Sequence, residues 1–298
     1  MRFAKRFRFL LLALALAALI SACAPKGPGA PLRIYFIDIG QGDATLIEDP
    51  LGGAAIVDAG PAQQGVVGKL RALGVTHLDL AIGTHPDADH IGAMDEVMKA
   101  FPPIVYLDPH IPHPTGQFIS LLTTLQELME SGKTKYLNPG RRTISLGRTL
   151  VEIYPTPDPP FDDTNNNSVV AKVVDDDFSA LLTGDQEHNE EGWLMSKIPP
   201  SEFKSDILKA GHHGSRTGTG DAWLDAVQPA AAIISCGRHN SYGFPHKEVL
   251  DKLEKRGIMI FRTDISGTLE LRSWGKGFEI RADGRTLYRS HDFRDHRP

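Results

Sequence analysis

The heptapeptide Thr84 to His90 reads Thr-His-Pro-Asp-Ala-Asp-His and places four metal-binding side chains within six positions. Imidazole suits zinc, iron and manganese, and carboxylates make manganese or magnesium rivals to zinc. A single aspartate here would more often cap a helix than bind a metal. Four such side chains together are hard to explain as solvated surface, so the heptapeptide predicts the first ligand cluster of a two-metal hydrolase. The four are His85, Asp87, Asp89 and His90.

Two later motifs supply the remaining ligands, namely Thr183-Gly-Asp185 and Gly211-His-His213-Gly-Ser215. A carboxylate at Asp185 can bridge two cations held about 3.5–4 Å apart, which would activate a water and neutralise charge on substrate oxygens. The predicted cofactor is one or two divalent ions, zinc or manganese. The alternative for the paired histidines is that both are satisfied by hydrogen bonds. The sequence does not decide whether His212 or His213 binds the metal.

All three motifs follow segments that have the character of buried strands. The first follows the apolar run 78–83 and precedes residues 91–98, whose apolar spacing is helical. The second ends a predicted hairpin of strands 169–174 and 178–182, and the third follows the predicted strand 206–210. Loops at the carboxyl ends of strands usually carry the chemistry of a layered α/β fold. We therefore expect the three loops to meet.

Two tight turns near the N-terminus carry further polar side chains. Strands are expected at 32–38, 44–48 and 54–58, with turns at 40–43 and 58–60. Turn chemistry alone explains aspartate and glycine at such positions, so each residue taken singly is more often structural than catalytic. The residues concerned are Asp38, Gln41, Asp43 and Asp58. Helices are expected at 62–73, 118–129, 187–197 and 247–255.

The first residues are typical of an export signal. Four basic side chains precede the apolar run 9–20, which is too short to span a bilayer comfortably. Ile20-Ser-Ala-Cys23 resembles the bacterial lipobox, in which the cysteine is lipidated. We expect a signal peptide over 1–22, a Pro/Gly-rich tether over 23–31, and an exported lipoprotein anchored to a membrane of the cell envelope through Cys23. A plain secretory signal or a transmembrane anchor is the alternative.

The remainder is expected to form one compact domain over 32–285, followed by a charged tail over 286–298. Without residues 1–22 the chain keeps 28 basic and 37 acidic side chains, a formal charge of −9. A domain with this negative charge lacks the positive electrostatic field expected of a non-specific nucleic-acid binder. Apart from Cys23, Cys236 lies in an apolar run and is expected to be a buried small hydrophobe without a disulfide.

Together these motifs resemble the metallo-β-lactamase superfamily, whose general motif is His-x-His-x-Asp-His. They are closer to the branch that forms the soluble domain of bacterial competence DNA-uptake channel proteins, in which the second histidine is often aspartate. The resemblance extends to Phe36-Ile-Asp38-Ile-Gly-Gln41-Gly-Asp43, Val57-Asp58-Ala-Gly60, Asn167-Ser168 and His246. It implies an αββα sandwich of two mixed β-sheets, with helices on the outer faces and metals at one edge.

The resemblance also implies roles for individual residues. One metal would be held by His85, Asp87 and Asp185, and the other by Asp89, His90, Asp185 and His213. His212 or His246 would contact the scissile phosphate or protonate the leaving group, and Asp89 is a further catalytic candidate. The expected substrate or supporting residues are Asp38, Gln41, Asp43, Asp58, Asn167, Ser168 and Ser215. This chain departs from the family where Asp87 replaces a histidine and where Asn167-Ser168 stand at the third histidine motif, which leaves the first metal fewer nitrogen ligands.

The leading functional hypothesis is an exported, metal-dependent phosphodiesterase or nuclease that acts on an anionic substrate such as single-stranded DNA. Local basic residues could still surround the cleft of the acidic domain, among them Lys209, Arg216, Arg238, Lys247 and Arg262. The second hypothesis is hydrolysis of a carboxylate ester, lactone or β-lactam on the same scaffold. The third is a non-catalytic surface lipoprotein that binds a partner. The sequence does not indicate the oligomeric state.

Overall fold

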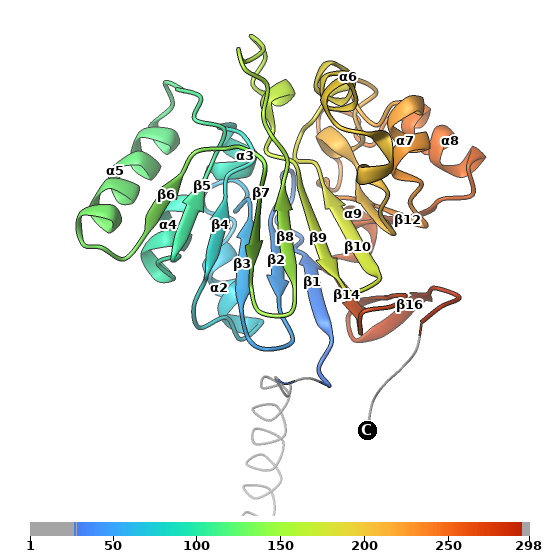
Figure 1. The fold of residues 1–298 in the computed structure, drawn as a ribbon, viewed down its shortest axis with the longest axis horizontal. Coiled ribbons are helices and arrows are strands. Elements are labelled where there is room, and N and C mark those ends of the chain that lie inside the picture. The colour runs from blue at the N-terminus through green and yellow to red at the C-terminus, as the bar shows by residue number, and fades with distance from the viewer. Residues whose placement is uncertain (1–26, 28, 294–298) are drawn as a thin grey trace, which may run out of the picture.

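The computed structural model describes residue 27 and residues 29–293, which form two mixed β-sheets packed face to face with helices on both outer faces (Figure 1). This confirms the expected αββα sandwich. The expected signal peptide 1–22 and the lipidation site Cys23 lie outside the described residues. In the part of the chain that the structure describes, no helix is long and apolar enough to cross a membrane.

The first sheet has nine strands in the order β16-β15-β14-β1-β2-β3-β4-β5-β6. Neighbours from β16 to β3 pair antiparallel, and those from β3 to β6 pair parallel. The strands are β1 (Leu32–Phe36), β2 (Thr45–Glu48), β3 (Ala54–Val57), β4 (Leu80–Ile82), β5 (Val105–Leu107), β6 (Lys135–Leu137), β14 (Leu269–Ser273), β15 (Glu279–Ala282) and β16 (Arg285–Arg289).

The second sheet has seven strands in the order β13-β12-β11-β10-β9-β8-β7. It is antiparallel from β7 to β10 and parallel from β10 to β13. The strands are β7 (Arg142–Ser145), β8 (Leu150–Ile153), β9 (Ala171–Asp175), β10 (Phe178–Leu182), β11 (Ile207–Lys209), β12 (Ala231–Ile234) and β13 (Met259–Arg262).

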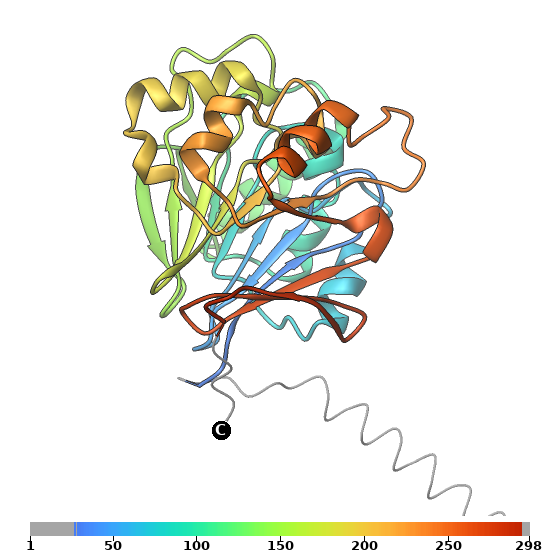
Figure 2. The same cartoon turned by 90° about the vertical axis from the view of Figure 1, so that its right-hand side faces the viewer.

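Helices cover the outer faces of both sheets. In α5, Phe118, Leu121 and Leu125 recur at helical spacing and are buried, so one stripe of the helix packs inward. The first sheet carries α2 (Val66–Ala72), α3 (Ala88–Ile91), α4 (Met94–Ala100) and α5 (Gly116–Glu130). The second carries α6 (His188–Lys197), α7 (Asp221–Val227) and α8 (Lys247–Lys255), and the short α9 (Thr263–Ser266) follows β13. The turned view faces the α6 to α8 side (Figure 2).

A core of alternating side chains fills the space between the sheets. In β1, Leu32, Ile34 and Phe36 are fully buried and point into this core, while Arg33 and Tyr35 between them are only partly buried. The same alternation in β9 of the second sheet supplies part of the facing layer, while β14, beside β1, extends the layer of the first sheet. Burial of the inner face makes the register of these strands specific, because a shift of one residue would turn every core side chain outward. The loops at the strand ends are thereby held in fixed positions.

The structure differs from the sequence-based boundaries in three places. The helix expected over 91–98 is interrupted, because α3 ends at Ile91 and α4 begins only at Met94. Between them lies Gly92, where a Cβ would be 2.2 Å from the Ala88 carbonyl oxygen. Strand β16 continues the first sheet past the domain end expected at residue 285. The described part of the expected tether lies against the domain, since Gly29 accepts a hydrogen bond of 3.2 Å from the Trp274 indole.

Candidate metal centre

Three loops meet at one edge of the sandwich, and each follows a strand. The metal loop (residues 84–90) follows β4, Asp185 follows β10, and His213 follows β11. His90 Nε2 lies 3.1 Å from Asp185 Oδ1 and 3.3 Å from His213 Nε2. His213 Nε2 lies 3.3 Å from Asp185 Oδ2 and 3.2 Å from Asp89 Oδ2. The structure therefore brings two imidazoles and two carboxylates from distant segments within reach of one cation.

A second group of possible ligand atoms also lies near Asp185. His85 Nε2 is 3.8 Å from Asp87 Oδ2 and 4.0 Å from Asp185 Oδ2, and His212 Nε2 is 3.8 Å from the same Asp185 oxygen. Ligands bound at about 2.0–2.2 Å from one ion cannot be more than twice that distance apart, and all three separations are within this limit. Asp185 thus contacts both groups, as a bridging carboxylate would.

Supporting contacts orient His90 toward the centre. Its Nδ1 lies 2.8 Å from Asp58 Oδ2, and Asp58 in turn accepts hydrogen bonds of 2.8 and 2.7 Å from the backbone N–H and the hydroxyl of Thr84. An imidazole that donates Nδ1–H to a carboxylate presents an unprotonated Nε2 to a metal. Asp58 therefore supports the centre from behind His90.

His213 and His212 are held in different ways. Nδ1 of the buried His213 donates to the Ser235 carbonyl at 2.9 Å, so its Nε2 faces Asp89 and Asp185. Nδ1 of His212 lies 2.7 Å from Glu187 Oε1, and this ring is partly exposed. Both residues have positive φ values, 45° and 53°, a strained conformation that turns successive side chains away from each other. This geometry favours His213 as the metal ligand.

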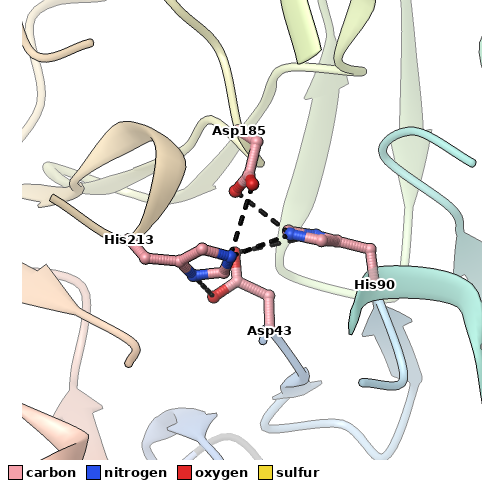
Figure 3. Close-up of side chains that lie close together, drawn as sticks. All are labelled: Asp43, His90, Asp185 and His213. Carbon is pink, nitrogen blue, oxygen red and sulfur yellow. Dashed lines mark hydrogen bonds and ion pairs between the residues drawn. The ribbon is translucent and has the colours of Figure 1, made fainter. Parts of the chain in front are cut away.

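Asp43 also lies at the centre, where it forms a compact group with His90, Asp185 and His213 (Figure 3). Its carboxylate faces the Nδ1 atoms, at 3.7 Å from that of His213 and 3.9 Å from that of His90. Those nitrogens already have partners, and Asp43 itself is paired with the ammonium of Lys209. We therefore place Asp43 in the support of the site and Asp89 among the candidate ligands.

The charge of this group is reflected in shifted pKa values. Burial opposes protonation of His90, but the Asp185 and Asp58 carboxylates outweigh it and raise the pKa of His90 well above its ordinary value. In the same way, Asp185 outweighs burial and raises the pKa of His213 to about 9. Burial would raise the pKa of Asp185, but His213 and His90 hold it well below its usual range. Excess negative charge therefore attracts cations here, whether protons or metals.

The polar atoms of the site fit a divalent metal. His85 Nε2 is buried, has no hydrogen-bond partner among the described residues and points toward Asp87 and Asp185. Burial and the neighbouring His90 also lower its pKa, so it is a neutral imidazole with a free lone pair. Buried polar atoms normally have partners, and a metal ion would provide one here. Mixed imidazole and carboxylate ligands suit zinc or manganese.

Two predicted residues of the Asn165–Ser168 segment support the site through hydrogen bonds. The Ser168 hydroxyl accepts a 3.2 Å hydrogen bond from the Asp185 backbone N–H and donates to the Asn165 carbonyl. The Asn167 side chain bonds the backbone of Phe161 and Asp163, which closes the long loop before β9. Among the described residues, no hydrogen bond joins either side chain to a ligand atom, so neither takes the metal-binding role of the histidine in the third family motif.

Four other predicted residues lie outside the ligand group. Asp38 accepts from the Gly40 backbone at 3.1 Å and stabilises its own turn. Gln41 accepts from the Gly237 backbone at 3.1 Å. The Ser215 hydroxyl lies 2.8 Å from that of Thr217. His246 Nδ1 accepts from the Arg216 backbone at 3.0 Å, and no hydrogen bond or ion pair joins this ring to the ligand group among the described residues.

The sequence-based reasoning missed two important groups. Lys209 is buried and donates to Asp43 and, at 2.9 Å, to the Gly184 carbonyl, although we expected it among basic residues around the cleft. Glu187, which orients His212, was also missed. A lysine inside an otherwise apolar strand was a usable signal, because an unpaired buried ammonium is costly. Nothing local to Glu187 indicated its partner.

Comparison with known proteins agrees with this geometry. The metallo-beta-lactamase superfamily matches residues 37–238. The chain is 31% identical over 265 residues to ComE operon protein 3 of Bacillus subtilis, covering 80% of this chain and 33% of that protein. It is 28% identical over 255 residues to Recombination protein 2 of Haemophilus influenzae, covering 83% of this chain and 30% of that protein. The chain therefore spans about a third of the length of these relatives.

A solved structure shows the same fold. CmlA, a diiron β-hydroxylase from Streptomyces venezuelae, superposes with a TM-score of 0.53 at 12% identity, over 83% of this chain and 55% of that chain. At this identity the likeness concerns the fold alone. The family match spans the metal loop, Asp185 and His213. The relatives confirm the resemblance to competence proteins. The chain belongs to the metallo-beta-lactamase superfamily of metal-dependent hydrolases.

Proposed function

We propose that the protein is a phosphodiesterase that cleaves an anionic substrate, such as a nucleic acid, with a metal-activated water. The observation that carries the proposal is the convergence of His90 and His213 with Asp89 and Asp185, at separations of 3.1–3.3 Å. The names of two relatives, which refer to a competence operon and to recombination, support a nucleic-acid substrate.

Metal binding defines the first role of the site residues. Asp89, His90, Asp185 and His213 would hold one ion, and His85 and Asp87 would hold a second together with Asp185. Ions bound there would provide Lewis acidity toward phosphoryl oxygens and would lower the pKa of a water. The protein orients these ligands through Asp58 and Ser235, which hold the far nitrogens of the two central imidazoles.

Proton transfer defines the second role. Glu187 holds Nδ1 of His212, and Nε2 lies on the side of the site, 3.5 Å from the Asn165 amide nitrogen and 3.8 Å from Asp185 Oδ2. With a proton on Nε2 as well, His212 is our candidate for the acid that protonates the leaving oxygen, in preference to His246. Asp89, whose side chain is partly exposed beside His213, is our candidate for the group that accepts the proton of the attacking water.

A phosphodiesterase assay with metal analysis tests this proposal. Purified protein should contain zinc or manganese and should hydrolyse bis-p-nitrophenyl phosphate and single-stranded DNA. Asp185→Asn should reduce both activities to background, whereas Asp177→Asn, at an exposed turn, should match the wild type. Metal-loaded protein that cleaves nitrocefin or a lactone but no phosphodiester would contradict the proposal. Folded protein that binds no metal would point to a binding role.

We also propose that the protein is exported and held at a membrane by a lipid on Cys23. The support is the basic and apolar segment before the lipobox-like Ile20-Ser-Ala-Cys23. Mass spectrometry of the mature N-terminus should find a diacylated or triacylated cysteine, and Cys23→Ser should release the protein from the membrane fraction. An unmodified N-terminus after Ala22, or one that retains residues 1–22, would contradict the lipoprotein assignment.

A further inference from the structure

An aromatic pair with an exposed outer ring lies next to the metal centre. Tyr242 and Phe244 stack with ring centroids 5.3 Å apart and an interplanar angle of 13°. Phe244 is also 5.3 Å from the ring of His212 and 6.0 Å from that of His213. Tyr242 is 62% exposed, so its outer face is free for another ring. The pair forms a path of aromatic rings from the candidate ligands to the surface.

The loop that carries the pair, residues 237–246, is internally braced. The Asn240 side-chain amide donates to the carbonyls of Gly237 and Phe244 at 2.9 and 2.8 Å, and its oxygen accepts from the Phe244 backbone at 2.9 Å. The loop also packs closely on the turn at Gln41, since a Cβ on Gly237 would lie 2.7 Å from the Gln41 nitrogen. These contacts hold Tyr242 in an exposed position before any ligand arrives, which reduces the entropic cost of binding.

A pocket of about 630 Å³ with a cationic wall adjoins the aromatic pair. Phe244, Ile265 and Arg238 line it, and Ile265 is 65% exposed. Arg238 uses Nε to donate to the Asp264 carbonyl at 3.1 Å, while its terminal nitrogens have no hydrogen bond or ion pair to another described residue. Arg262 also lines the pocket but is paired with Asp264. Arg238 is therefore available to an anion beside the rings.

We propose that loop 237–246 contains a base-stacking subsite for single-stranded nucleic acid, with a nucleobase on the outer face of Tyr242 and a phosphate on Arg238. This subsite rests on the proposed phosphodiesterase function, because it would lead the strand toward the metal centre. Aromatic platforms beside cations bind single strands with little sequence preference, since every base has a π face. Bases in a duplex are already stacked on each other, so the subsite would discriminate against duplex.

A binding measurement separates the base contribution from that of the backbone. Full-length protein in EDTA, which prevents cleavage, is titrated into 5′-fluorescein-labelled octathymidylate and into an abasic octamer with the same phosphates, and anisotropy is recorded. Stacking contributes about 1–3 kcal/mol per base, so Tyr242→Ala should weaken octathymidylate binding by roughly 5- to 150-fold. Tyr242→Phe should retain wild-type affinity. Neither change should affect the abasic octamer.

Arg238→Gln provides the matched test of the phosphate contact. It should weaken binding of both octamers alike and reduce the number of ions released in the salt dependence by about one. Three results would each overturn the subsite. The wild type could bind the two octamers equally, it could bind neither, or Tyr242→Ala could bind octathymidylate with unchanged affinity. Hydrolysis with manganese is measured in parallel. Base-dependent binding without hydrolysis would refute the proposed reaction but support the subsite. Hydrolysis at the same rate in the wild type and in Tyr242→Ala would support the reaction but refute the subsite.

Discussion

Replacing Lys209 with methionine tests whether a buried ammonium holds the metal centre together. Lys209 is 2% exposed; its Nζ pairs with Asp43, donates to the Gly184 carbonyl at 2.9 Å and lies 3.9 Å from Asp185 Oδ1. Although burial would lower the pKa of this lysine, Asp43 and Asp185 outweigh it and raise the pKa. Methionine keeps most of the side-chain volume but removes the charge and the donor.

The expected loss follows from the partners that remain. Removing one member of a buried ion pair costs about 3–5 kcal/mol, because the other charge stays buried without compensation. For a domain of this size that corresponds to a fall in Tm of roughly 6–20 °C in metal-free protein. A divalent ion would offset the uncovered carboxylates, so adding manganese should raise the Tm of Lys209→Met by more than it raises that of the wild type.

Thermal unfolding followed by circular dichroism, with and without manganese, measures both effects. Lys133→Met, at an exposed position, is the matched control. The double variant Lys209→Met with Asp43→Asn should recover part of the lost stability, since the uncompensated charge is removed as well. The ion-pair reasoning is refuted if the free energies of unfolding of Lys209→Met and Lys133→Met differ by less than about 1 kcal/mol. It is also refuted if the double variant is no more stable than Lys209→Met.

Three further predictions concern the metal ligands. In metal-free protein, the raised pKa values of His90 and His213 stabilise the fold below pH 6.5, and this contribution is lost as the pH rises through about 9 for His213. A metal must displace these protons, so isothermal titration at pH 6, 7 and 8 should show affinity rising at least tenfold per pH unit, and a flat profile would exclude this competition. Loss of a supporting contact typically lowers metal affinity by roughly 10–100-fold, and His213→Ala should lower it by more than that. His212→Ala should keep its metal but lose activity. The reverse pattern would exchange the roles of the two histidines. Gly42→Ala should impair metal binding because its Cβ would lie 2.2 Å from a backbone oxygen of the metal loop, whereas Gly40→Ala, with open space around it, should alter stability alone; equal effects on metal content would contradict this.

The strand-end loops of the site could be predicted because their signals are local. An apolar run followed by closely spaced ligands indicates a strand and the loop after it, and the same holds for the segments that end at Asp185 and His213. Family motifs then indicated that the loops meet. The convergence itself depends on the order of strands β4, β10 and β11 in two sheets, which no local pattern contains.

The supporting contacts could not be predicted because they join residues far apart in the chain. Asp58 was expected among the supporting residues, but its partner His90, after the neighbouring strand β4, was not indicated by any local pattern. The Ser235 carbonyl that holds His213 has no side-chain signal at all. Strand β16 was missed for another reason. Its residues are largely exposed at the end of the first sheet, so its sequence lacks the apolar alternation of a buried strand.

The charges at the centre connect metal occupancy to the choice of substrate. Five carboxylates gather there, those of Asp43, Asp58, Asp87, Asp89 and Asp185, and among the described residues they face one ammonium, that of Lys209. With neutral imidazoles the net charge is −4, which two divalent ions would cancel and one would only halve. A centre left at −2 would repel a phosphate brought against the ligand atoms themselves, so we infer that the proposed reaction requires both ions. The acidic surface of the domain then matters less, because charges farther away than about 8 Å are largely screened at physiological salt.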